Sequence, residues 1–306
     1  ACAILRAADS VPKALAGELM ADLTGLMQRH KFVQVVAAAC QCLGALASIH
    51  PGAAKHVTKV TVAVYKKLQA HLKSVPGADE AEAELAKWSA AAGRLLYMLG
   101  QLCRHAAGVL DSGSSPPLPM RFALELALQA FSPGFAEGKD DHHGWLLRLR
   151  DSALQAAGLI FVAKPSLMVT EESDKLVCSV ASREAPPKLK IRVLGNLSEL
   201  LKSEEDRLLS SQVAGEAEAQ EAKALSASGI RVPSAPLQTQ NGERDSVSLA
   251  SGIIQRYWER VLALATDAPQ KGEDQGESGD SAAAVTRQRA LELMEAVLRG
   301  GLVAPW

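Results

Sequence analysis

The stretch "RDSALQAAGLIFVAKPSLM", residues 150–168, decides the predicted fold. Its small and apolar residues continue a stripe spaced by three and four positions, which is typical of a buried helix face; the stripe is Leu146, Leu149, Ala153, Ala157 and Ile160. Arg148, Asp151 and Gln155 occupy the opposite side. Pro165 has no amide hydrogen, so it ends this helix and directs a second one. Gly158 costs up to about 1 kcal/mol of helix propensity, and we expect closer packing against a neighbouring helix to offset it.

Helical periodicity recurs along the whole 306-residue chain. Hydrophobic residues make up 48% but aromatic residues only 4%, so the strong helix formers alanine and leucine supply the apolar content. No segment shows the alternation of β-branched and polar residues that strands need. Short breakers such as "HPGAA", "VPGAD" and "EAPPK" separate the helical stretches. The sequence therefore predicts an all-α fold.

About ten helices joined by short turns exceed one four-helix core and favour an α-solenoid over a compact bundle. Gly44 and Pro51 recur 114 residues later as Gly158 and Pro165, which is three times 38. A further 38 residues lead from Gly158 to Asn196. A two-helix unit of about 40 residues is the HEAT length, so we predict a HEAT-repeat α-solenoid.

Two segments depart from this pattern, at residues 204–246 and 268–283. Both are polar and rich in acidic, Ser, Gly or Gln residues, so they cannot bury enough apolar surface to order themselves. We predict disordered inter-helix loops there, with transient helix in the Ala/Glu run at 213–225. The predicted organisation is HEAT helices over 1–203, a loop over 204–246, and further helices over 247–306 that the loop 268–283 interrupts.

The most apolar run, residues 32–49, is interrupted by Gln34, Gln41 and Ser48. A buried core helix is favoured over a membrane span. The chain starts "ACAILRAADS" and ends "GGLVAPW" directly after a helical pattern. Both ends look cut, so we expect a part of a longer protein. The five cysteines are odd in number and set in helical patterns, which suits a reducing compartment.

Catalytic and metal-binding constellations are not convincing in this sequence. Cys40 with Cys42, and Cys103 with His105, are two positions apart and would point about 200° apart on a helix. Core cysteines are the favoured interpretation. The pair His142-His143 beside two aspartates could bind a metal, although a solvated loop is favoured. No nucleotide-binding or hydrolase motif is present, so we predict no enzyme activity and no cofactor.

The positive feature is electrostatic. The formal net charge of the chain is only -1, yet no Asp or Glu occurs from Leu23 to Ala78. Seven basic residues in that stretch give a net charge of +7: Arg29, Lys31, Lys55, Lys59, Lys66, Lys67 and Lys73.

Four of these lysines, Lys55, Lys59, Lys66 and Lys73, fall within about 40° at 100° per residue. We call them the lysine face, which spans about 27 Å of helix. The stripe Val57, Val60, Val64, Leu68 and Leu72 lies on the other side. The face is either a solvated helix surface or a contact for a phosphate backbone or an acidic partner. A weaker cluster, near Glu184, comprises Lys188, Lys190 and Arg192.

Six ordered blocks resemble one family: "QCLGALASIHPGAAKHVTKVTVAVYKKLQAHLKS" (41–74), "LLYMLGQLCRHAAGVLD" (95–111), "AGLIFVAKPSLM" (157–168), "LKIRVLGNLSELLKSEEDRL" (189–208), "SLASGIIQRYWERVLAL" (248–264) and "RQRALELMEAVLRGGLVAP" (287–305). The resemblance is to the Nipped-B-like sister-chromatid cohesion proteins, the large subunits of cohesin loaders. It covers about 20–204 and 247–305. The chain departs from the family at 111–144, 209–246 and 268–283.

This resemblance implies a nuclear, chromosome-associated HEAT solenoid that binds cohesin subunits and DNA and promotes cohesin loading. It implies no catalytic residue, because the ATPase sites belong to cohesin. The smaller loader subunit would bind a region outside this sequence, and the C-terminal family domain would begin near Ser251. The alternative is a generic HEAT scaffold of the transport-receptor or phosphatase-subunit type. A helical enzyme is a third class, with His142 and His143 as its only candidates.

Overall fold

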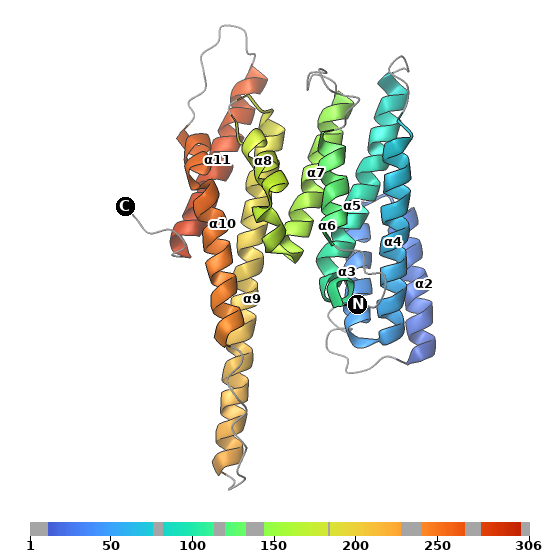
Figure 1. The fold of residues 1–306 in the computed structure, drawn as a ribbon, viewed down its shortest axis with the longest axis vertical. Helices are drawn as coiled ribbons and strands as arrows, with labels where there is room; N and C mark the ends of the chain where they lie inside the picture. The colour runs from blue at the N-terminus through green and yellow to red at the C-terminus, as the bar shows by residue number, and fades with distance from the viewer. Residues whose placement is uncertain are drawn as a thin grey trace. The chain divides into compact units, whose positions relative to one another are not determined.

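The computed structural model describes residues 12–75, 82–112, 120–132, 144–182, 184–227, 240–266 and 277–300. Every regular element in these ranges is helical, which confirms the predicted all-α class (Figure 1). The elements are α2 (Lys13–Arg29), α3 (Val33–Ile49), α4 (Pro51–Lys73), α5 (Glu82–Ser112), α6 (Met120–Phe131), α7 (Gly144–Ala163), the 3₁₀ helix η2 (Pro165–Val169), α8 (Glu171–Val180), α9 (Pro187–Ala227), α10 (Gln240–Thr266) and α11 (Glu277–Arg299). Within the described ranges, none of these helices combines the length and apolarity that crossing a bilayer requires.

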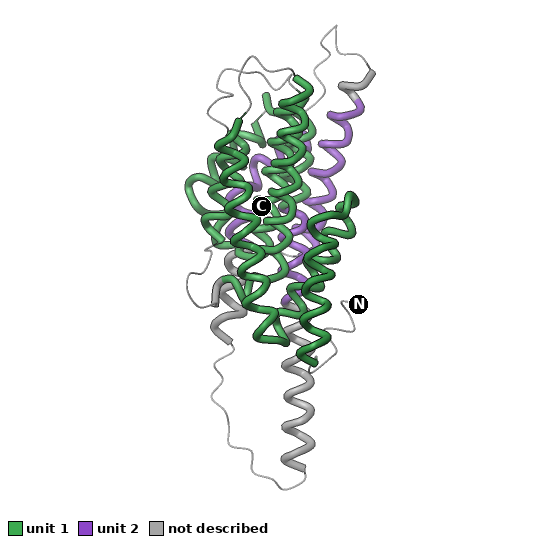
Figure 2. Tube along the Cα trace, turned by 90° about the vertical axis from the view of Figure 1, so that its right-hand side faces the viewer, with its two compact units in different colours: residues 1–196 green, residues 197–306 purple. Residues whose placement is uncertain are grey.

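The chain divides into two compact units, residues 1–196 and 197–306 (Figure 2). In the first unit, α2 to α7 lie side by side with roughly aligned axes (Figure 1). Helices pack mainly against near neighbours in the chain: α3 against α2 and α4, α5 against α3, α4 and α7, and α6 against α7. In the second unit, α10 packs against α11. Near-neighbour packing of this kind is consistent with an α-solenoid.

The core consists of the stripes that periodicity predicts. All five residues of the α4 stripe are buried, and so are all five of the α7 stripe. α7 is covered on more sides than its sequence suggests, because six further residues are also buried: Trp145, Leu154, Ala156, Gly158, Leu159 and Phe161. Val33, which continues an apolar stripe in the sequence, is 54% exposed at the first residue of α3.

Glycines mark the closest helix contacts in the first unit. A Cβ atom at Gly158 would lie 2.2 Å from the side chain of Asn196, and one at Gly44 would lie 2.2 Å from the carbonyl oxygen of His105. The chain also leaves helical geometry at Ala106, next to this contact. Real Cβ contacts are essentially never that short, so a larger residue would displace the His105 backbone at Gly44 or the Asn196 side chain at Gly158. The close approach predicted at Gly158 is therefore confirmed.

The break after α7 differs in detail from the prediction that a second helix follows Pro165 directly. Pro165 opens the short 3₁₀ helix η2, and α8 begins only at Glu171. The hydroxyl of Thr170 donates to the carbonyl of Leu167, 3.0 Å away, which holds the connecting turn. Three acidic residues in the first turn of α8, Glu171, Glu172 and Asp174, favour a helix start there because they complement the helix dipole.

The structure is helical over much of the segments predicted as loops, including the run 213–225 for which the sequence predicts transient helix. α9 continues through residues 204–227, α10 already includes 240–246, and α11 includes 277–283. Low apolar content argues against burial, but the Ala, Glu, Gln, Lys and Leu residues of 204–225 are strong helix formers. Residues 228–239 and 267–276 lie outside the described ranges.

Candidate nucleic-acid interface

The lysine face belongs to α4, whose start is fixed by local sequence. Pro51 occupies the first helical position, where a missing amide hydrogen is tolerated. The His50 ring precedes it as the N-cap. Its Nδ1 atom accepts hydrogen bonds from the backbone amides of Gly52 at 3.1 Å and Ala53 at 3.3 Å. These bonds cap the first turn, where amides lack partners within the helix; the Ala53 amide also donates to the carbonyl oxygen of His50 at 3.0 Å.

Two polar contacts join α4 to its neighbours. His71 Nε2 donates to the carbonyl oxygen of Trp88 at 3.0 Å, and Trp88 Nε1 donates to the carbonyl oxygen of His71 at 3.1 Å. The two rings are stacked, with centroids 5.5 Å apart. On α2, Thr24 Oγ1 hydrogen-bonds His56 Nε2 at 2.9 Å. Together with the buried valines and leucines, these contacts fix the rotation of α4 about its axis.

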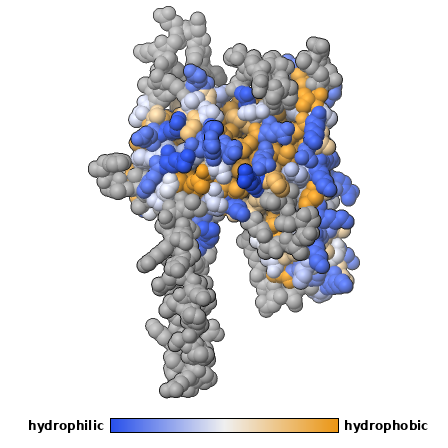
Figure 3. Space-filling model, in the orientation of Figure 1, coloured by the Kyte–Doolittle hydropathy of each residue, from blue (hydrophilic) through white to orange (hydrophobic). Residues whose placement is uncertain are grey.

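This rotation points the lysine face outward. Lys55, Lys59, Lys66 and Lys73 are all exposed, while Val57 and Leu68 on the other side are fully buried. No ion pair among the described residues involves any of the four. The nearby start of α5 carries Glu84, which pairs with Lys87 at 2.7 Å instead. Figure 3 shows hydrophilic residues along the right-hand edge, where Figure 1 places α4 and α2. The face is therefore an exposed, positively charged surface.

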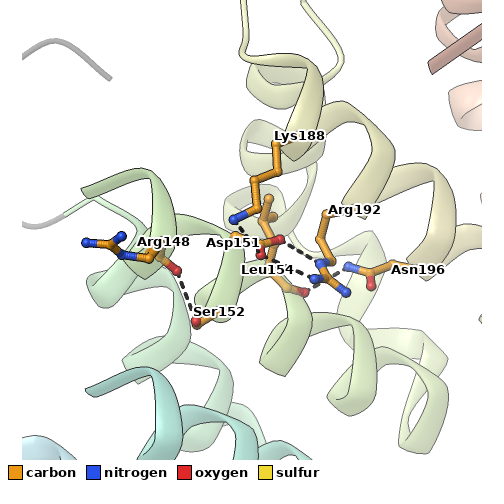
Figure 4. A network of polar contacts seen from close by, with 7 residues as sticks. All are labelled: Arg148, Asp151, Ser152, Leu154, Lys188, Arg192 and Asn196. Carbon is orange, nitrogen blue, oxygen red and sulfur yellow. Dashed lines mark hydrogen bonds and ion pairs between the residues drawn. The ribbon is translucent and has the colours of Figure 1, made fainter. Parts of the chain in front are cut away.

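Two residues of the weaker basic cluster contact Asp151 of α7 (Figure 4). Arg192 Nε and Nη2 donate to Asp151 Oδ1 at 2.7 Å and Oδ2 at 3.2 Å, and Lys188 Nζ lies 3.3 Å from Oδ2. Lys190 is only 8% exposed. The side chain of Asn196 donates to the carbonyl of Leu154 at 2.8 Å.

These contacts hold the first part of α9 against α7. In the cluster predicted as a DNA or acidic-partner contact, Lys190 is buried, and one carboxylate engages the charges of Lys188 and Arg192. These residues take part in helix packing, and their contact with DNA or an acidic partner stays a prediction. Sequence reasoning did not identify Asp151 as the partner of this cluster. The sequence pattern identifies it as polar and opposite the buried stripe, but not as the partner of residues about 40 positions later.

The described cysteines of the predicted pairs lie in the core. Cys40, Cys42 and Cys103 are each at most 5% exposed. Burial raises the pKa of the Cys40 thiol to about 12, which keeps it protonated and unreactive at neutral pH. His142 and His143 lie outside the described residues. In the part of the chain that the structure describes, no three His, Cys, Asp or Glu side chains gather closely enough to hold a metal ion.

No protein-family model matches this chain, and no curated protein matches it either. The family resemblance therefore depends on the six sequence blocks alone.

Asp151→Ala is expected to destabilise the chain by about 1–2 kcal/mol. The Asp151 carboxylate is only 14% exposed, and its removal leaves Arg192 partly buried without its anion. Urea denaturation followed by circular dichroism measures the loss. The control is Glu171→Ala, which removes a solvent-exposed pair with Lys175 and should change stability little. Equal midpoints for the two variants would show that the Asp151 network contributes nothing to packing.

Proposed function

We propose that this chain is a non-catalytic HEAT-repeat part of a cohesin loader. In this proposal it contacts DNA through the lysine face, binds cohesin subunits, and promotes the loading of cohesin onto chromatin in the nucleus for sister-chromatid cohesion. The observation that carries the DNA contact is the lysine face itself. Four exposed lysines share one side of α4, and its other side is packed in the core.

Lysine is suited to a contact with the DNA backbone. Its ammonium group is a point charge that binds phosphate oxygens without reading base edges. A face about 27 Å long could neutralise about three or four phosphates, each releasing condensed counterions. Such binding tolerates any sequence, which suits a protein that acts at many chromosomal loci.

The cohesin part of the proposal depends on the sequence resemblance. The first block, residues 41–74, contains all of α4 and therefore the complete lysine face. Three other blocks fall in α5, at the α7–η2 junction and in α9. The closely packed residues Gly44, Gly158 and Asn196 also lie in these blocks. The blocks thus carry both the proposed contact and the packing that positions it.

A generic HEAT scaffold is the competing function. In that case the lysine face would bind an acidic protein surface, and DNA would have no effect. Both proposals need a partner protein, and neither needs a catalytic residue or a cofactor in this chain.

The test is ATP hydrolysis by purified cohesin with and without DNA, in the presence of the full-length protein that contains this sequence. We expect the protein to stimulate hydrolysis, and DNA to increase the stimulation. The same assay with a phosphatase-scaffold HEAT protein is the control. A full-length protein that binds DNA but leaves cohesin hydrolysis at its basal rate would contradict the cohesin-loader proposal and leave the DNA contact standing.

A further inference from the structure

The turn between α2 and α3 exposes large apolar side chains that a folded domain usually covers. Phe32 is 67% exposed, Val33 54% and Leu26 44%. They occupy the last turn of α2, the connecting segment and the first residue of α3. Two exposed cations, Arg29 and Lys31, lie in the same eight-residue stretch. We call these five residues the turn patch.

Two side chains of α5 hydrogen-bond the backbone of the turn patch segment. Arg94 Nη2 donates to the carbonyl oxygens of Met27 at 3.2 Å and Gln28 at 2.8 Å. These carbonyls belong to the last turn of α2, where carbonyl oxygens accept no hydrogen bond from within the helix. The hydroxyl of Tyr97 donates to the carbonyl oxygen of Val33 at 3.3 Å. Two side chains from one helix therefore fix the backbone on both sides of the turn.

Phe32 itself is positioned by its own turn. Its backbone amide donates to His30 Nδ1 at 3.3 Å, and the His30 and Phe32 rings lie 5.5 Å apart. Its carbonyl oxygen accepts from the amides of Val35 and Val36. A fixed backbone reduces the conformational entropy that an aromatic anchor loses on binding.

We propose that the turn patch is a docking site for an acidic protein segment with apolar anchor residues. The three apolar side chains supply the anchor surface, and buried aromatic residues dominate the energetics of such contacts. Arg29 and Lys31 supply charge complementarity, because no Asp or Glu occurs between Leu23 and Ala78 to neutralise them within the sequence. The guanidinium of Arg29 lies over Gly25, with Nη2 3.0 Å from the position of a Cβ there, so it stays beside the last turn of α2.

An acidic peptide is favoured over single-stranded nucleic acid. A nucleic acid would stack a base on Phe32 and bind phosphates through the cations. It would leave Leu26 and Val33 unused, whereas a peptide with two or three apolar anchors covers all three residues. The inference is independent of the proposed DNA contact, since it uses a different surface.

The test uses the 306-residue chain and a fluorescent 15-residue peptide with Leu and Phe anchors at helical spacing among six Asp and Glu residues. Fluorescence anisotropy should show micromolar binding. Phe32→Ala should weaken it at least tenfold, and Arg29→Glu with Lys31→Glu should weaken it similarly. Phe122→Ala is the control, because Phe122 is another solvent-facing phenylalanine, 44% exposed, on α6. It should leave binding unchanged. Melting temperatures of all variants should match the parent, since the altered side chains are exposed.

Four outcomes would overturn the inference. One is equal affinity of the parent for a peptide whose acidic residues are replaced by lysine. Another is an equal effect of Phe32→Ala and Phe122→Ala, or no binding of the acidic peptide at all. The last is binding of a 15-nucleotide oligothymidine that depends on Phe32 while the peptide fails to bind, which would make the patch a base-stacking surface.

Discussion

Gly44→Ala is expected to destabilise the chain by about 2–3 kcal/mol, although alanine is the better helix former by about 1 kcal/mol. The added Cβ would lie 2.2 Å from the carbonyl oxygen of His105 and 2.7 Å from its carbon. Both are backbone atoms of α5, so no side-chain rotation relieves the clash. α3 and α5 would have to separate, and the buried leucines around the contact, Leu43, Leu46 and Leu102, would lose packing.

Urea denaturation followed by circular dichroism measures this effect. Gly17→Ala is the matched control, since Gly17 also lies within a helix but has nothing within 4 Å of its Cβ position. That variant should be unchanged or stabilised by up to about 1 kcal/mol. Gly158→Ala should fall between the two, because its obstacle is the Asn196 side chain, which can rotate but then loses its bond to Leu154. Equal stability of Gly44→Ala and Gly17→Ala would contradict the close α3–α5 contact.

Changing Lys55, Lys59, Lys66 and Lys73 together to glutamate is expected to reduce DNA affinity by about 100-fold at 50 mM salt. If the parent neutralises three or four phosphates, its affinity should fall with a log–log slope of about -3. That slope corresponds to about a 60-fold loss between 50 and 200 mM salt. The variant should bind weakly at both concentrations with a nearly flat slope. Filter binding or anisotropy with duplexes of two unrelated sequences measures both effects, and the two duplexes should behave alike.

The control changes the same number of charges elsewhere. Lys13, Lys87, Lys175 and Lys202 are also exposed and lie outside α4, so their replacement by glutamate alters net charge equally. If both quadruple variants lose affinity equally, net charge alone explains the binding. If the lysine-face variant binds as tightly as the parent at every salt concentration, the face is only a solvated surface. Retained DNA binding with lost stimulation of cohesin would instead assign the face to an acidic protein partner.

Local periodicity accounts for what the sequence predicts correctly. The stripes of α4 and α7 are set by residues three and four positions apart, and the exposure of the lysine face follows from its place opposite such a stripe. The close approach at Gly158 could also be predicted, because a glycine in an apolar helix indicates a tight neighbour.

What sequence reasoning missed depends on contacts between distant residues. Lys188 and Arg192 look like free cations beside Glu184, but their partner Asp151 belongs to another helix. The helix over 204–227 extends beyond the run 213–225 where helix was predicted, because strong helix formers can form a helix without much apolar surface. The exposure of Phe32 could not be read from its apolar neighbours, because only the tertiary packing of α2, α3 and α5 leaves it uncovered.

The two tightly packed glycines should follow different evolutionary courses. The obstacle at Gly158 is a side chain, so a relative with a larger residue there can compensate by carrying a smaller one at the position of Asn196. Positions 158 and 196 can therefore change together during evolution. The obstacle at Gly44 is a peptide carbonyl, which every amino acid at position 105 would present. No single substitution elsewhere can accommodate a change at Gly44, so divergence in this lineage should leave it a glycine long after its neighbours have been replaced.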